Sequence, residues 1–140
     1  MLGLISQGVS HASSFGELFI LISRRNGNEM TRKDLRNIFL NRKRRWNSNL
    51  EIRRAKVQQC DRHPDFLGSI MMMSDRSYKK QWYRHVFTGA AKLPRVLDSQ
   101  QEGLKFASIY DGAVVLYCGQ PSEKIELPEG VLRIPFNNLK

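Results

Sequence analysis

The 140-residue sequence has few cysteines, no long apolar run and few acidic residues, and each shortage excludes a class of protein. Two cysteines cannot form the framework of a disulfide-dense miniprotein. No apolar stretch reaches the roughly 18 residues that a membrane-spanning helix needs. The chain also lacks internal repeats and low-complexity segments, and its 41% apolar and 26% charged residues are typical of soluble domains. Its length suits one domain rather than two, so we expect a single unit with its own core.

Signatures of catalysis and of metal binding are missing as well. The sequence has no Gly-x-Ser-x-Gly nucleophile elbow and no phosphate loop of the Gly-Lys-Ser type. His63 and His85 are the only candidate bases outside the amino-terminal segment. Cys60, Asp61, His63 and Asp65 mix soft and hard metal ligands at a spacing typical of no metal site. We therefore expect no enzyme, no metal site and no cofactor.

Acidic residues are scarcest where basic residues are densest. The chain has 23 Lys and Arg against 13 Asp and Glu, a formal charge of +10. Twelve of the basic residues lie between Arg24 and Lys56, where only Glu29, Asp34 and Glu51 oppose them. A field concentrated in this way attracts phosphate, nucleic acid, anionic lipid or an acidic protein. A solubilising, arginine-rich surface is the alternative reading of the same cluster.

The amino-terminal segment, residues 1–16, has a mildly apolar stretch followed by small residues around Ser10–Ser13. It lacks a basic start, so it is either the remnant of a secretory signal peptide or a disordered leader. Residues 17–140 are expected to form the folded domain. In an oxidising compartment Cys60 and Cys118 can form one disulfide if their Cα atoms come within about 7 Å.

Strand-like and helix-like patterns alternate along the folded domain. Leu18–Ile22 and Ala113–Cys118 are continuous apolar runs, typical of strands that are buried on both faces. The segments Thr31–Asp34 and Ser99–Glu102 read as capping boxes and predict helix starts. This order of elements predicts an α/β fold with a mostly parallel sheet. Further expected elements are a loop at 24–29, a helix ending near 39, a basic loop at 41–49, a strand at 50–58, helices from 64 and after 74, a helix ending near 109, and a short edge strand at 131–134.

Three segments, in their order and spacing, resemble one lobe of the periplasmic phosphate-binding proteins that serve ABC importers. They are Thr31–Leu40 followed by Trp46, Trp82–Gly89 followed by Pro94, and Asp111–Tyr117. The resemblance covers roughly Glu17–Gly119 and implies a three-layer α/β/α lobe of a solute-binding protein. It also implies a substrate-binding component that holds inorganic phosphate or a similar small anion between two lobes, on helix amino-termini. This chain has room for one lobe, so a homodimer that closes over one anion is a hypothesis.

The resemblance also implies ligand-binding residues. Asp61, Arg62 and His63 match the phosphate-cradling Ser-Gly-Thr of that family. The Arg62 guanidinium can clamp an anion with two hydrogen bonds, whereas the Asp61 carboxylate repels one. Thr88 and Gly89 match the family's Phe-Thr-Gly motif and are further candidates. The chain also departs from the family at two glycine positions, occupied here by Asn41 and Leu116.

The basic loop supports a different hypothesis. Arg42, Lys43, Arg44 and Arg45 precede Trp46, and four cations beside an aromatic ring can neutralise phosphates and stack a base. No helix-turn-helix, zinc finger or RNP-like motif accompanies them, which favours a polyanion or a protein partner over nucleic acid. We therefore expect an exported, non-enzymatic protein that binds phosphate or another small anion. The alternative is a polyanion- or protein-interaction module in which the phosphate site is lost.

Overall fold

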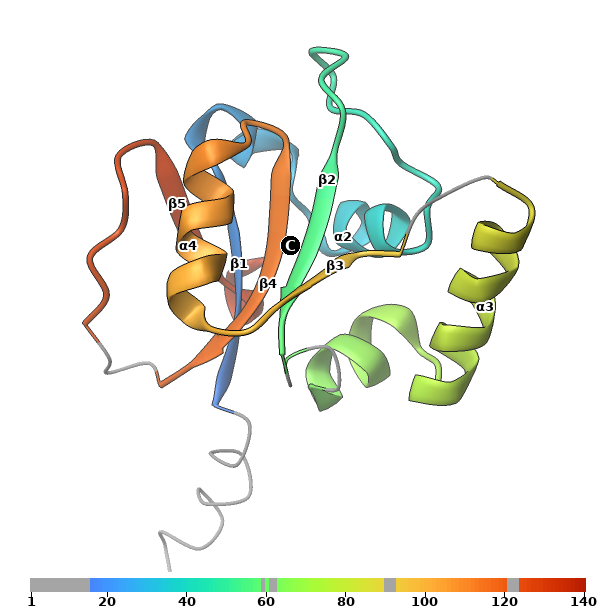
Figure 1. The fold of residues 1–140 in the computed structure, drawn as a ribbon. Helices are drawn as coiled ribbons and strands as arrows, with labels where there is room; N and C mark the ends of the chain where they lie inside the picture. Colours follow the sequence, from blue (N-terminus) through green and yellow to red (C-terminus); the bar gives the residue numbers. More distant parts are fainter. Residues whose placement is uncertain (1–15, 59, 61–62, 90–92, 121–123) are drawn as a thin grey trace, which may run out of the picture.

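The structure is a computed structural model that describes residues 16–58, 60, 63–89, 93–120 and 124–140. The expected leader lies outside these residues apart from Gly16. The described chain forms one five-stranded sheet with helices around it (Figure 1). In chain order the elements are β1 (Glu17–Ser23), the 3-10 helix η1 (Arg24–Glu29), α2 (Arg32–Phe39), β2 (Arg53–Val57), the π-helix η3 (Asp65–Met71), α3 (Asp75–Phe87), β3 (Arg95–Leu97), α4 (Gln100–Ile109), β4 (Ala113–Gly119), β5 (Val131–Pro135) and the 3-10 helix η4 (Phe136–Asn138).

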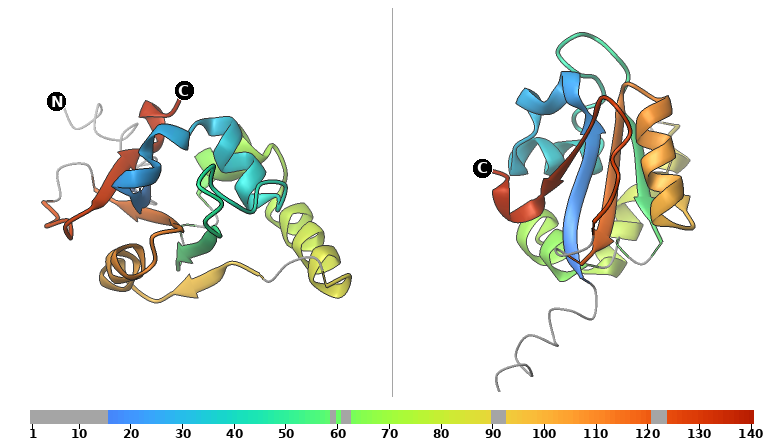
Figure 2. Two further views of the ribbon diagram at one scale, coloured as in Figure 1. Left: turned by 90° about the horizontal axis from the view of Figure 1, so that it is seen from above. Right: turned by 90° about the vertical axis from the view of Figure 1, so that its left-hand side faces the viewer.

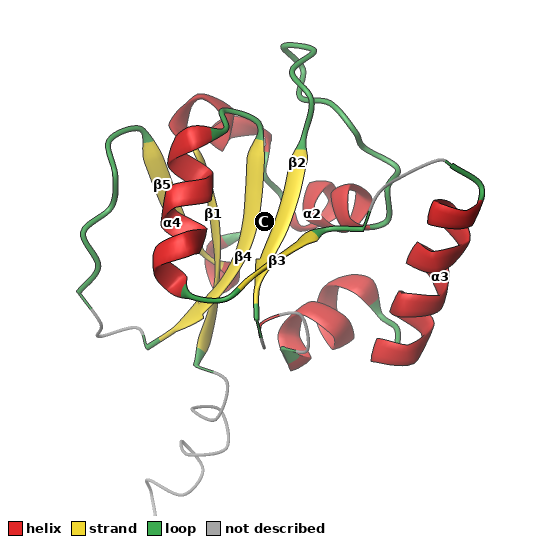
Figure 3. Cartoon of the chain, viewed as in Figure 1, coloured by secondary structure: helices red, strands yellow, loops and turns green. Residues whose placement is uncertain are grey.

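The strands of the sheet have the order β3-β2-β4-β1-β5. β2 pairs in parallel with both β3 and β4, whereas β1 is antiparallel to both β4 and β5. Four of these described strands therefore point the same way, and β1 runs against them (Figure 3). The α/β class and the mostly parallel sheet are confirmed. The opposite direction of β1 is a feature that the sequence pattern did not predict.

The two continuous apolar runs form the centre of the sheet. β1 and β4 lie side by side, with Leu18 opposite Cys118. Every residue of Leu18–Ile22 and of Ala113–Tyr117 is buried. Both strands are buried because helices cover both faces of the sheet. α4 packs on one face, while η1 and α2 lie on the other side (Figure 2). Strands covered on both faces have no polar side, which explains their unbroken hydrophobic sequences.

A row of aromatic contacts joins α2, η3 and α3. Leu35, Ile38 and Phe39 are buried on the inner face of α2. The ring of Phe39 meets the ring of Phe66 in η3 edge-on, with centroids 5.2 Å apart. Phe66 in turn contacts Tyr78 of α3 edge-on, at 5.7 Å. Such pairs stabilise the contact beyond the area they bury, so the three helices support one another.

Both predicted capping boxes stand at helix starts. Thr31 Oγ1 accepts a hydrogen bond from the Asp34 amide, and the Asp34 carboxylate accepts one from the Thr31 amide, each at 3.1 Å. At the start of α4, Ser99 Oγ accepts from the Glu102 amide at 3.2 Å. The Glu102 carboxylate bonds the Asp98 amide at 2.8 Å, one residue before the expected partner. The side chains that satisfy these free amides are those that the sequence predicted.

The structure differs from the prediction at three places. The strand expected at 50–58 begins only at Arg53, because the chain before it folds back through an isolated bridge between Arg45 and Glu51. The loop expected at 24–29 is the 3-10 helix η1. The third difference is β3, which was not predicted, since three residues are too few to show a strand alternation.

Candidate anion-binding site

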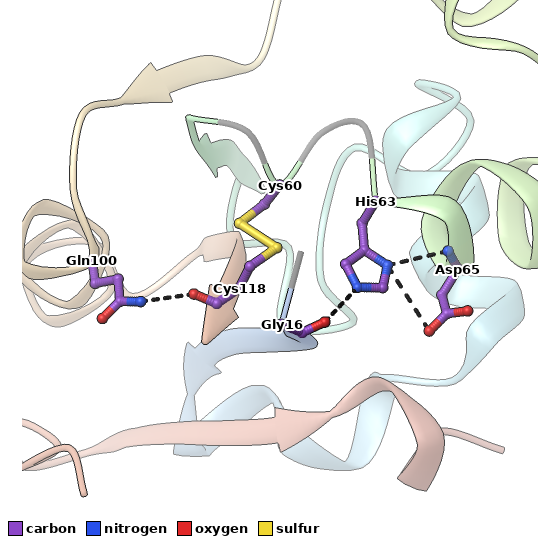
Figure 4. The surroundings of a disulfide bond; sticks show 6 residues. All are labelled: Gly16, Cys60, His63, Asp65, Gln100 and Cys118. Atoms are coloured by element: carbon purple, nitrogen blue, oxygen red, sulfur yellow. Dashed lines mark hydrogen bonds and ion pairs between the residues drawn. A yellow bond between two sulfur atoms is a disulfide. The ribbon is translucent and has the colours of Figure 1, made fainter. Parts of the chain in front are cut away.

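Cys60, the residue before the segment expected to cradle phosphate, follows the end of β2 and forms a disulfide (Figure 4). Asp61 and Arg62 fall outside the described residues. Cys60 and Cys118 are bonded, with their Cα atoms 5.6 Å apart, so Cys60 is tied to the end of β4. The Gln100 side chain donates to the carbonyl oxygen of Cys118 at 2.8 Å and joins the start of α4 to the same place.

Hydrogen bonds within the chain occupy the polar groups around His63, which is buried. Its Nδ1 accepts from the Asp65 amide at 3.1 Å, so Nε2 carries the proton and donates to the carbonyl of Gly16 at 2.9 Å (Figure 4). The amides of Phe66 and Leu67 donate to the carbonyl of His63 at 3.0 and 3.1 Å. The amides that begin η3 are therefore already satisfied. The Asp65 carboxylate, 3.9 Å from His63 Nδ1, adds negative charge at this position.

Thr88 and Gly89 serve to end α3. The Thr88 hydroxyl donates to the carbonyl of His85 at 2.9 Å, and its amide donates to that of Arg84 at 3.1 Å. Gly89 has a φ of +75°, in the left-handed region that suits a helix terminus. Its amide donates to the carbonyl of Val86 at 3.0 Å. The geometry of Thr88 and Gly89 is thus that of a helix end, although Gly89 also borders the groove described below.

Trp46 is a core residue, although it follows four cations in the sequence. Its side chain is only 2% exposed, and its Nε1 donates to the carbonyl oxygen of Gly112 at 3.2 Å. A Cβ atom at Gly112 would collide with the carbonyl oxygen of Glu51, so only glycine fits this turn. The Trp46 ring is therefore not available to stack a base, and this part of the polyanion prediction is wrong.

The four cations of the basic loop have different environments. The Lys43 ammonium lies 3.2 Å from the Asp34 carboxylate and 3.6 Å from that of Glu29, so its charge is neutralised. Burial of Asp34 opposes its ionisation, but hydrogen bonds from Thr31 and Lys43 outweigh burial and lower its pKa below the usual 3.8. The three other cations are exposed: Arg42, Arg44 and Arg45.

Arg44 and Arg45 border a groove of about 1000 Å³ at the start of β2. We call it the basic groove, because five arginines line it against a single carboxylate, that of Glu51. The carboxy-terminal ends of α3 and α4 supply apolar side chains to its wall, and their carbonyl dipoles favour cations nearby. The five arginines are Arg44, Arg45, Arg53, Arg54 and Arg95.

Arg54 is the most constrained of these arginines. Its side chain is half-buried, with Nε donating to the carbonyl of Ile38 at 2.7 Å and Nη2 donating to Asn41 Oδ1 at 3.1 Å. The guanidinium lies 5.4 Å from the centre of the Trp82 ring. Burial lowers the pKa of Arg54 and outweighs the opposing influence of Tyr78 and Glu51, while the nearby Arg44 charge acts in the same direction as burial. The groups that accept its hydrogen bonds are neutral, and the Glu51 carboxylate of the same groove makes no ion pair with it, so an incoming anion would supply a direct counter-charge.

The other groove arginines also lack acidic partners. In the part of the chain that the structure describes, no carboxylate lies within 4.0 Å of any of the five. Arg53 instead stacks on the Tyr110 ring at 4.5 Å, and Arg45 donates to the carbonyl of Asn49 at 2.9 Å. The groove therefore carries an excess of positive charge, with five arginines and one carboxylate among its described lining residues. It lies at the start of β2, at the opposite end of that strand from Cys60.

Sequence reasoning found only part of the groove. It assigned Arg44 and Arg45 to a polyanion site but not Arg53, Arg54 or Arg95. Arg53 and Arg54 did leave a signal, because two adjacent arginines at the start of a strand interrupt its apolar alternation. Arg95 left none, since the parallel pairing of Ala55 with Arg95 brings it to the groove.

No helix among the described residues is both long and apolar enough to cross a bilayer. The chain matches no protein-family model, and no curated protein or solved structure is significantly similar to it. The likeness to phosphate-binding proteins therefore stays a prediction that rests on the three sequence segments.

Proposed function

We propose that this chain is a non-enzymatic binding domain that recognises an extended polyanion through the basic groove. The observation that carries the proposal is the half-buried guanidinium of Arg54, which is held by neutral acceptors among four further arginines. A cation that is partly withdrawn from water without a carboxylate partner is costly to the fold. Such groups gather at functional sites, where the ligand provides the missing charge.

A polyanion suits the groove better than a single phosphate ion. The five arginines come from three segments, the loop before β2, β2 itself and the start of β3. A chain of phosphates or carboxylates can contact several of them at once. The satisfied amides at the start of η3 give no comparable support to a small-anion site near His63.

The resemblance to a solute-binding lobe remains part of the proposal for the fold. The position of α4 on one face of the sheet and of α2 on the other side supports a three-layer α/β/α lobe. Asn41, at a position where the family has glycine, adopts a left-handed φ of 62°. The disulfide between Cys60 and Cys118 supports an exported, periplasmic protein. In this proposal the scaffold is kept while the phosphate site is replaced by the groove.

The test measures binding of a labelled oligothymidylate of about 20 nucleotides at several salt concentrations between roughly 50 and 200 mM. The full chain is compared with a double variant, Arg44→Ala with Arg45→Ala. Each phosphate contact on a single strand contributes about −0.7 to the slope of log K against log salt, so the slope should become shallower by about 1.4. An unchanged slope would show that the groove is not the contact surface.

The matched control removes two exposed lysines that do not line the groove, in Lys33→Ala with Lys105→Ala. It loses the same net charge and should leave the slope nearly unchanged. An equal effect of both double variants would mean that only the overall charge matters, against a specific groove. Calorimetric titration with inorganic phosphate tests the competing function. A saturable micromolar Kd, about −8 kcal/mol, would favour a small-anion receptor instead.

A further inference from the structure

A second cationic surface lies on α3, outside the basic groove. On a helix, residues at positions i, i+4, i+7, i+8 and i+11 share one face. We call this set the outer face of α3. Its members are all exposed: Arg76, Lys80, Tyr83, Arg84 and Phe87.

The opposite face of α3 attaches the helix to the domain. Tyr78 and Trp82 are buried there, with the Tyr78 ring against Phe66 and the Trp82 ring beneath the Arg54 guanidinium. The helix stands at one side of the molecule, apart from the central strands (Figures 1 and 2). The helix is thus fixed by one face, and the outer face points to solvent.

The outer face combines aromatic rings with cations and has no carboxylate. Phe87 is 88% exposed and Tyr83 is 52% exposed. The single acidic residue of α3, Asp75, lies elsewhere on the helix and pairs with Lys79 at 3.3 Å. Leaving a phenylalanine ring almost wholly in water forgoes the free energy of its burial. The arrangement therefore favours a partner that is both anionic and apolar.

An anionic membrane surface has this combination of properties. Its headgroups attract Lys and Arg, while aromatic side chains settle at the boundary between headgroups and acyl chains. A single-stranded nucleic acid would require rings that line a cationic channel, whereas Tyr83 and Phe87 project from an outward helix face. We propose that the outer face of α3 docks on an anionic lipid surface, with its three cations at the headgroups and its two rings at the boundary.

The proposal is independent of the groove and is tested on the full chain by cosedimentation with vesicles. One set holds phosphatidylcholine alone and the other contains roughly 30% phosphatidylglycerol. We expect binding to the anionic vesicles only. Lys80→Ala with Arg84→Ala should weaken it about 25-fold, or about fivefold for each cation. Phe87→Ser should weaken it about fivefold or more, because the ring no longer enters the boundary.

Ile109→Ser is the matched control, since Ile109 is 58% exposed on α4 and lies outside the outer face. It should bind vesicles like the parent chain, whereas Lys33→Ala with Lys105→Ala, which removes two exposed cations outside both surfaces, should weaken vesicle binding much less than Lys80→Ala with Arg84→Ala. Equal binding to both kinds of vesicle, or no effect of Phe87→Ser, would overturn the proposal. It would also be overturned if Phe87→Ser weakened binding of the oligothymidylate more than binding of vesicles, because the face would then contact nucleic acid.

Discussion

The disulfide between Cys60 and Cys118 gives the sharpest test of what holds the domain together. The two residues are separated by 58 positions, so the bond closes a long loop in the unfolded chain. In the chain-entropy description, the unfolded state loses about 14 cal/mol/K through such a closure, or about 4 kcal/mol at 25 °C. Domains of ordinary stability have about 5–15 kcal/mol in all. Loss of the bond should therefore remove a large part of the free energy of unfolding.

The assay is urea denaturation of the oxidised and the reduced chain, followed by tryptophan fluorescence. Reduction is the cleaner perturbation, because Cys60 is buried and its replacement by alanine would also leave a cavity. The double variant Cys60→Ala with Cys118→Ala should match the reduced chain to within the cost of that cavity. A difference below about 1 kcal/mol between oxidised and reduced chains would refute the reasoning, because the unfolded chain would then gain little freedom on reduction.

Three further substitutions test the contacts around the basic loop. Trp46→Phe should reduce the free energy of unfolding by about 1–3 kcal/mol in urea, through the lost hydrogen bond to Gly112, but should leave the salt slope of oligothymidylate binding unchanged. Gly112→Ala should lower Tm, with a cost of at least about 2 kcal/mol, because its Cβ has no space. Because the pKa of Asp34 is lower in the folded chain than the usual 3.8, its ionised carboxylate stabilises the fold at pH values above 3.8. This stabilisation is lost as the pH falls through the pKa that Asp34 has in the folded chain. Asp34→Asn should thus be less stable than the parent at pH 7. The difference in free energy of unfolding between the two chains, measured by urea denaturation, should become smaller at acidic pH.

The parts of the fold that the sequence predicted are those that depend on neighbouring residues. The apolar runs at Leu18–Ile22 and Ala113–Cys118 form buried strands because their composition suits no other environment. The Thr31 cap was predictable because its partner lies three residues away. The direction of β1 was not, because it depends on pairing between segments that are nearly a hundred residues apart.

The candidate site was less predictable, since it depends on contacts that are distant along the chain. Trp46 is buried because Gly112, 66 residues later, accepts its hydrogen bond. The Lys43 ammonium is paired with the carboxylates of Glu29 and Asp34, while Arg95 lines the groove although it lies outside the basic third of the chain. A count of charges along the sequence therefore located the excess of cations but could not distinguish those that are neutralised from those that are not.

The antiparallel position of β1 also determines when this domain can fold during synthesis. Of the described strands, β1 leaves the ribosome first, but both of its neighbours, β4 and β5, lie in the last third of the 140 residues. A nascent chain that stops before Ala113 leaves both edges of β1 unpaired, and an exposed hydrophobic strand edge is an aggregation site. Pairing between such distant segments also folds slowly. Partial products of this chain therefore depend on rapid completion or on a chaperone until the carboxy-terminal strands arrive.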